Sequence, residues 1–111
     1  MSRYRISEAD RPYAEEFRRN LEADTYYHSP GLQRVLNVMR GPPKAGKYVL
    51  IVREPHTRWA LGRMPAARGE PVEIVPNVEY TDLKQAEWDV FCRRWKDLTG
   101  ADLGIEGPGR P

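Results

Sequence analysis

Residues 29–52 read SPGLQRVLNVMRGPPKAGKYVLIV and predict a helix, an abrupt stop and a buried strand in succession. Ser29 is a favourable N-cap, and Pro30 suits the first helical position because its missing N–H needs no partner there. Gly41 supplies a left-handed residue at the helix end, and Pro42-Pro43 prevents the helix from continuing. The apolar side chains recur at i, i+3, i+4 and i+7 on one face, which carries Leu32, Val35, Leu36 and Met39.

A β-hairpin is predicted from Lys47 to Met64. Its first strand contains a run that is apolar on both pleat faces, residues 48–52, as is typical of a strand covered on both sides. Residues 54–57 form the turn, and residues 58–64 alternate as the second strand. Pairing Glu54 with Thr57 gives one apolar face for the helix 30–40 to cover, made by Tyr48, Leu50, Val52, Trp59 and Leu61.

The opposite face of this hairpin has no predicted cover within the chain. It carries Val49, Ile51, Ala60 and Gly62. The same register sets Arg53 directly against Arg58, and like charges in that position are unfavourable unless an acidic group approaches from outside. We therefore expect this face to meet another protein.

Two further helices and a short strand complete the predicted domain. Residues 11–23, with Asp10 as the cap, place only Tyr13, Phe17 and Leu21 on a narrow apolar stripe that a partner could complete. Val72 to Val75 can add an edge strand between two prolines. The longest helix begins at Thr81 or Asp82, runs through Leu98 and is ended by Gly100, and it is apolar on more than one face.

These elements predict one small α+β domain, with a central antiparallel hairpin, a third short edge strand and about three helices. We expect an irregular arm at residues 1–9, the domain at 10–100 and a flexible tail at 101–111. A chain of 111 residues is long enough for one modest core.

Composition narrows the function classes. The formal net charge is only +2, and no nucleic-acid-binding motif accompanies it, which argues against nucleic acid as the partner. Arginine dominates the cations and favours paired contacts with carboxylates at an interface. A single cysteine excludes an internal disulfide, and without an apolar leader or membrane span we expect a cytoplasmic protein.

Candidate chemistry is sparse. Tyr26, Tyr27 and His28 precede a helix N-terminus and can face an anion or carboxylate; alternatively, the two tyrosines pack with their hydroxyls in solvent. His28 and His56 have no ligands at metal spacing, so no metal site is predicted. Cys92 lies in an apolar helical stripe, which favours a buried thiol over a nucleophile. We predict no catalytic residue.

Three groups of residues, in this order and spacing, resemble the small subunit of the N,N-dimethylformamidase family. The resemblance extends from about Tyr27 to Leu98. The SPxLQRV and GKY pieces are fairly specific together, whereas the last helix alone is a weak signal. The residues concerned are His28-Ser29-Pro30-Gly31-Leu32-Gln33-Arg34-Val35 with Asn37 and Arg40, then Gly46-Lys47-Tyr48, then Ala86, Val90-Phe91 and Arg93-Arg94.

The resemblance implies an accessory role. That family hydrolyses a dialkylated formamide to an amine and formate with a metal held in a separate, larger subunit. It therefore implies no cofactor in this chain, iron in the partner, and a hetero-oligomer with a large catalytic subunit. Our candidates for contacts with that partner are Arg34, Arg40, Arg53, Arg58, Trp88 and Trp95.

Two alternatives stay open on the sequence. One is a free-standing binding or regulatory domain that self-associates through the same apolar surface. The other is a small independent enzyme, for which Tyr26, Tyr27, His28 and His56 are the only candidate residues.

Overall fold

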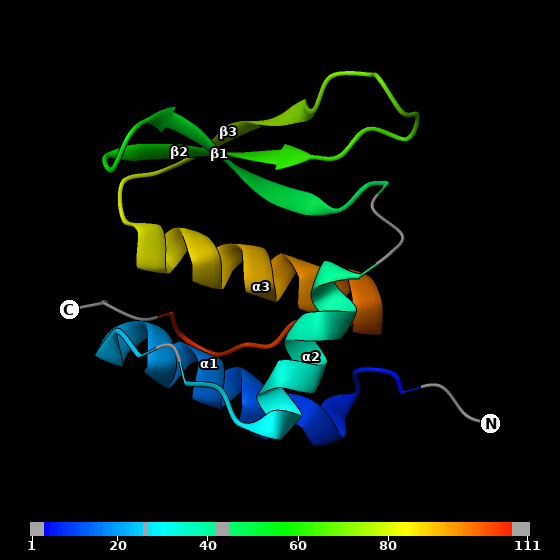
Figure 1. The fold of residues 1–111 in the computed structure, drawn as a ribbon, viewed down its shortest axis with the longest axis vertical. Helices are drawn as coiled ribbons and strands as arrows, with labels where there is room; N and C mark the ends of the chain where they lie inside the picture. The colour runs from blue at the N-terminus through cyan, green and yellow to red at the C-terminus, as the bar shows by residue number, and fades with distance from the viewer. Residues whose placement is uncertain (1–3, 26, 42–44, 108–111) are drawn as a thin grey trace.

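A three-stranded antiparallel sheet and helices on one side of it form the fold (Figure 1). The computed structural model describes residues 4–25, 27–41 and 45–107. The sheet has the order β1-β2-β3, α3 lies along one of its faces, and α1 and α2 lie beyond α3. The predicted α+β class is therefore confirmed. The described elements are η1 (Glu8–Asp10), α1 (Arg11–Ala23), α2 (Pro30–Arg40), β1 (Tyr48–Glu54), β2 (Arg58–Arg63), β3 (Glu73–Tyr80) and α3 (Leu83–Thr99).

Helix α2 begins as predicted but ends differently. Ser29 Oγ accepts the N–H of Leu32 at 3.2 Å, and the Glu16 carboxylate of α1 accepts both the N–H and the hydroxyl of Ser29 at 2.8 and 2.6 Å. At the other end Gly41 is extended, with φ −79°, so the expected left-handed residue is wrong. The Gly41 carbonyl instead accepts from the Lys47 ammonium. Pro42 and Pro43 lie outside the described residues.

Helix α3 is buried on two opposite sides, which explains its wide apolar arc. On one side it contacts the sheet: the Tyr80 hydroxyl donates to Asp89, and Arg94 Nη2 donates to the Tyr48 carbonyl at 2.7 Å. On the other side Phe91 stacks on Phe17 of α1, with ring centroids 4.6 Å apart. We expected the helix 30–40 to cover the hairpin, but α3 takes that place and α2 packs in the layer beyond it.

The register of the hairpin is confirmed over most of its length. Leu50 pairs with Leu61 and Val52 with Trp59. Beyond Val52 a bulge shifts the register, so Glu54, and not Arg53, lies opposite Arg58. The predicted clash of two arginines is therefore wrong. Arg58 instead forms ion pairs with Glu54 and Glu79, each at 3.6 Å.

Strand β3 is longer than the four residues predicted. It continues past Pro76, where the chain bulges: Asn77 is left-handed, with φ 63°, and the register with β2 shifts between Ala60 and Gly62. A bulge on an edge strand tolerates a proline because no ladder hydrogen bond is needed from its nitrogen.

Both ends of the described chain contribute to the core. Ile6 and Leu103 are buried at 6% and 3% exposure, and Ile105 packs against the same cluster. The expectation that the C-terminal segment has nothing to pack against is therefore wrong for this part of it. Asp10 does not cap α1 with its side chain; its carboxylate accepts the N–H of Ser7 at 3.0 Å.

Gly31 is required for the packing of α2 on α1, and replacing it tests that contact. A Cβ at Gly31 would lie 2.1 Å from Cζ of Tyr13, so Gly31→Ala has to displace the ring. We expect the free energy of unfolding to fall by about 1–3 kcal/mol, as for other overpacked sites, although alanine is the better helix former by about 1 kcal/mol. Chemical denaturation measures this. Gln33→Ala, on the exposed side of the same helix, is the control, and a Gly31→Ala protein as stable as that control would contradict the contact.

Trp95 is fully buried and is expected to act through the core. Truncating a buried aromatic side chain costs about 3–5 kcal/mol, so Trp95→Ala should lower the midpoint of unfolding strongly. Leu98→Ala, at a side chain that is 49% exposed on the same helix, should change stability by less than about 1 kcal/mol. Equal effects of the two substitutions would place Trp95 outside the core.

Candidate functional site

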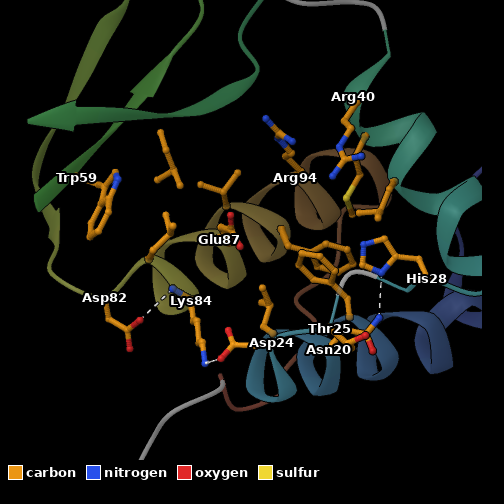
Figure 2. A pocket seen from close by; sticks show the side chains of 18 of the residues that line it. Asn20, Asp24, Thr25, His28, Arg40, Trp59, Asp82, Lys84, Glu87 and Arg94 are labelled. Atoms are coloured by element: carbon orange, nitrogen blue, oxygen red, sulfur yellow. Dashed lines mark hydrogen bonds and ion pairs between the residues drawn. The ribbon is translucent and has the colours of Figure 1, made fainter. Parts of the chain in front are cut away.

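A cleft of ≈ 850 Å³ separates the hairpin from α1 and α2, and one stripe of α3 forms its floor (Figure 2). The stripe contains Leu83, Glu87, Val90, Phe91 and Arg94. Apolar side chains from the other elements form the walls, including Leu36 and Met39 of α2 and Leu50 and Trp59 of the sheet. The fold thus brings five elements around one open space.

Two arginines meet at one end of the cleft (Figure 2). Arg94 is half-buried, and its Nε and Nη2 both donate to the Tyr48 carbonyl, which fixes the guanidinium beside β1. Burial lowers the pKa of Arg94, and the charge of Arg40 lowers it further. Arg40, in the last turn of α2, is exposed. The two cations are therefore close enough to repel each other.

Glu87 is an acidic residue of the cleft lining whose carboxyl interacts with the charge of Arg40. Burial raises the pKa of the Glu87 carboxyl, and the charge of Arg40 partly opposes that rise. Nevertheless, within the described parts of the chain neither arginine forms an ion pair with a carboxylate. Arg40, Arg94 and Glu87 thus line the cleft together, and the positive charges among them outnumber the negative one. Sequence reasoning missed Glu87, although its position one turn from Leu83 placed it on the same stripe of α3.

Of the predicted ligand-facing residues, His28 reaches the cleft. Asn20 Nδ2 donates to the Tyr27 carbonyl at 2.8 Å and lies 2.9 Å from His28 Nδ1. Because a carbonyl only accepts, this amide nitrogen is a donor to both atoms, and the neutral His28 ring then carries its proton on Nε2. Tyr27 is 73% exposed and is not among the residues that line the cleft, and Tyr26 lies outside the described residues.

Polar residues at two helix ends and one residue of the hairpin turn also line the cleft. Lys84 Nζ lies 3.1 Å from Asp24 Oδ2 and links the start of α3 to the end of α1. Asp82 caps α3 by accepting the N–H of Lys84 at 2.9 Å. His56 lines the cleft from the hairpin turn, where it adopts φ 65°.

The face of the sheet turned away from α3 is a second candidate surface. None of the described residues forms a helix over it (Figure 1). A Cβ at Gly62 would lie 2.6 Å from Ile51 Cδ1 and 2.7 Å from Val72 Cγ1, so these side chains close over the glycine. Ile74, paired with Gly62, is 41% exposed beside them. We call this surface the outer sheet face; its residues are Val49, Ile51, Ala60, Gly62, Val72 and Ile74.

The predicted partner-binding residues are dispersed over the molecule. Arg34 covers the Tyr4 ring at 4.4 Å, and Arg40 lies in the cleft. Arg53 is exposed at the β1 bulge, and Arg58 bridges two glutamates next to the outer sheet face. Trp88 and Trp95 are 5% and 0% exposed in the core, so a direct contact between either ring and a partner stays an untested prediction.

Neither a metal site nor a membrane span is found in residues 4–25, 27–41 and 45–107. No three His, Cys, Asp or Glu side chains there lie close enough together to hold a metal ion. No helix there is long and apolar enough to cross a membrane.

The family comparison agrees with the resemblance and extends it to the N-terminal helix. The family model described as N,N-dimethylformamidase alpha subunit matches residues 3–104. The chain belongs to this family. The matched range includes α1, which lies outside the stretch that first suggested the resemblance. The family name describes one subunit of a multi-subunit enzyme. No curated protein matches the chain.

The reactivity of the Cys92 thiol distinguishes a structural role from that of a nucleophile. Burial, followed by the charges of Asp89 and Asp102, raises the pKa of the Cys92 thiol to about 12. At pH near 8 the folded protein then holds very little thiolate, and an aromatic disulfide reagent should modify it roughly a hundredfold or more slowly than the unfolded chain. Stopped-flow absorbance with and without guanidinium measures both rates. Comparable rates would show that the thiol is accessible and ionisable.

Proposed function

We propose that this chain is a non-catalytic accessory subunit of a dimethylformamidase-like amide hydrolase. The observation that carries the proposal is the family match over residues 3–104. In the proposed assembly the chain docks on a larger catalytic subunit, and that subunit holds the iron.

The outer sheet face is the surface we assign to docking. Its apolar side chains are contiguous, and charged residues flank them: Arg58 with Glu54 and Glu79 at one end, and Arg53 at the bulge. An apolar centre with an arginine-containing polar rim is the usual composition of a protein interface. The wide apolar arc of α3 is not available for this purpose, because both of its sides are already buried within the chain.

Co-expression with the neighbouring genes tests the assembly. We expect a larger protein to co-purify with this chain and the complex to contain iron, whereas the isolated chain contains none in stoichiometric amount. Native mass spectrometry and metal analysis provide both readouts. A stable monomer that captures no larger protein would contradict the proposal, and a homodimer would favour the self-associating domain.

Two glutamate substitutions on opposite faces of the sheet test the docking surface. Ile74→Glu would bury an unpaired charge in the interface, which costs about 2 kcal/mol or more and weakens capture of the larger protein roughly thirtyfold. Val52→Glu is the matched control, because Val52 is an exposed β-branched residue on the α3 side of the sheet. Thermal unfolding of each isolated variant excludes misfolding as the cause. Equal capture by both variants would remove the outer sheet face from the interface.

A further inference from the structure

The charged end of the cleft contains two cations and one acidic group that pairs with neither. Arg94 is fixed by its two hydrogen bonds to the Tyr48 carbonyl, at 3.1 and 2.7 Å. Arg40 approaches it from α2 and acts electrostatically on both Arg94 and Glu87. Like charges held together without full compensation are unfavourable for folding and are characteristic of sites that bind an opposite charge.

The remaining donors around this end can hold a carboxylate. The Arg94 guanidinium presents five N–H groups, of which those on Nε and Nη2 supply the bonds to Tyr48, and Arg40 is exposed and lines the same cleft. Two guanidinium groups bind a carboxylate through short, charge-assisted hydrogen bonds. His28 also lines the cleft, and its Nδ1 lies 2.9 Å from Asn20 Nδ2.

The rest of the cleft suits the apolar part of such a molecule. Leu50, Trp59 and Val90 line the cleft, Trp59 lies away from the two arginines (Figure 2), and Leu83 of the lining is 42% exposed. The volume of ≈ 850 Å³ lies in the range of about 300–1,000 Å³ that is typical of small-molecule sites. An inorganic anion would leave most of this apolar surface uncovered.

We propose that the cleft binds a small organic monocarboxylate with an apolar body. Arg40 and Arg94 hold the carboxylate, and the apolar residues between α3 and the hairpin hold the body. Glu87 limits the affinity, since its own charge opposes that of the ligand. The outer sheet face lies on the other side of the sheet, so this site does not depend on the proposed docking.

Titration of the isolated full chain with benzoate, followed by ¹H–¹⁵N NMR, tests the site. We expect saturable shifts of the Trp59 indole N–H and of the Arg40 and Arg94 Nε–H signals. Benzamide has the same shape without the charge and should shift them at least about tenfold more weakly, as expected for loss of a charge-assisted pair. Equal responses to the two compounds, or no response to millimolar benzoate, would overturn the proposal.

Substitutions that should change the affinity for benzoate in opposite directions make the test specific. Arg40→Gln should weaken benzoate binding about tenfold, because it removes one of two charged donors, whereas Glu87→Gln should strengthen it. Arg34→Gln changes the charge of the same helix but lies against Tyr4, away from the cleft, and should leave binding unchanged. Arg94→Lys keeps a positive charge near the Tyr48 carbonyl but removes the planar guanidinium. It therefore tests whether benzoate binding needs the guanidinium geometry as well as the charge.

Three results would contradict the assignment. Arg34→Gln acting as strongly as Arg40→Gln would show that only the overall charge matters. If Glu87→Gln weakened binding, the carboxylate of benzoate would not lie at the charged end of the cleft. If the NMR signals of the cleft residues do not change with benzoate but shift when the larger subunit is added, the cleft is a protein contact.

Discussion

The burial of α3 on two opposite sides is the constraint on which the rest of the structure depends. The sheet has only three strands and cannot form a core by itself. Helix α3 covers one of its faces with hydrogen bonds from Arg94 and to Asp89, and stacks its other side on Phe17. Among the described residues α3 packs against both the sheet and α1, and the Lys47–Gly41 hydrogen bond adds one direct link between the hairpin and the end of α2. The cleft lies between these layers, with one stripe of α3 in its lining.

Local signals predicted most individual elements. The Ser29 cap, the bounds of α1 and α2, and the register from Tyr48 to Val52 all follow from short-range chemistry, and the structure confirms them. The errors concern the conformation of a helix end and the register next to a turn. Gly41 accepts either a left-handed or an extended conformation, and the bulge after Val52 replaces an arginine pair with the Glu54–Arg58 pair. Composition gave no reason to extend β3 past Pro76, because the left-handed Asn77 that permits it depends on the partner strand.

What covers the apolar arc of α3, and which residues meet in the cleft, depends on the tertiary arrangement and could not be predicted from the sequence. A wide apolar arc on a helix is equally compatible with a partner and with burial on two sides within the chain, and only the path of α1 distinguishes them. Arg40 was recognised as a candidate, but its relation to Glu87 and Arg94 arises from two helices that are more than 40 residues apart in the chain. No spacing rule connects them. The C-terminal residues Leu103 and Ile105 were missed because two apolar residues among glycines show no periodicity.

The two candidate surfaces can act together because the sheet separates them. The outer sheet face looks away from α3, whereas the cleft opens between the hairpin and the α1–α2 pair (Figures 1 and 2). A protein seated on the outer face would therefore leave the mouth of the cleft open to solvent. It would also touch the same hairpin that supplies Leu50 and Trp59 to the cleft. The Tyr48 carbonyl of β1 accepts from the Arg94 guanidinium of α3. A rotation of β1 against α3 on docking would therefore shift the guanidinium. One hydrogen-bonded carbonyl thus connects the hairpin, which carries the proposed docking surface, with the charged end of the cleft.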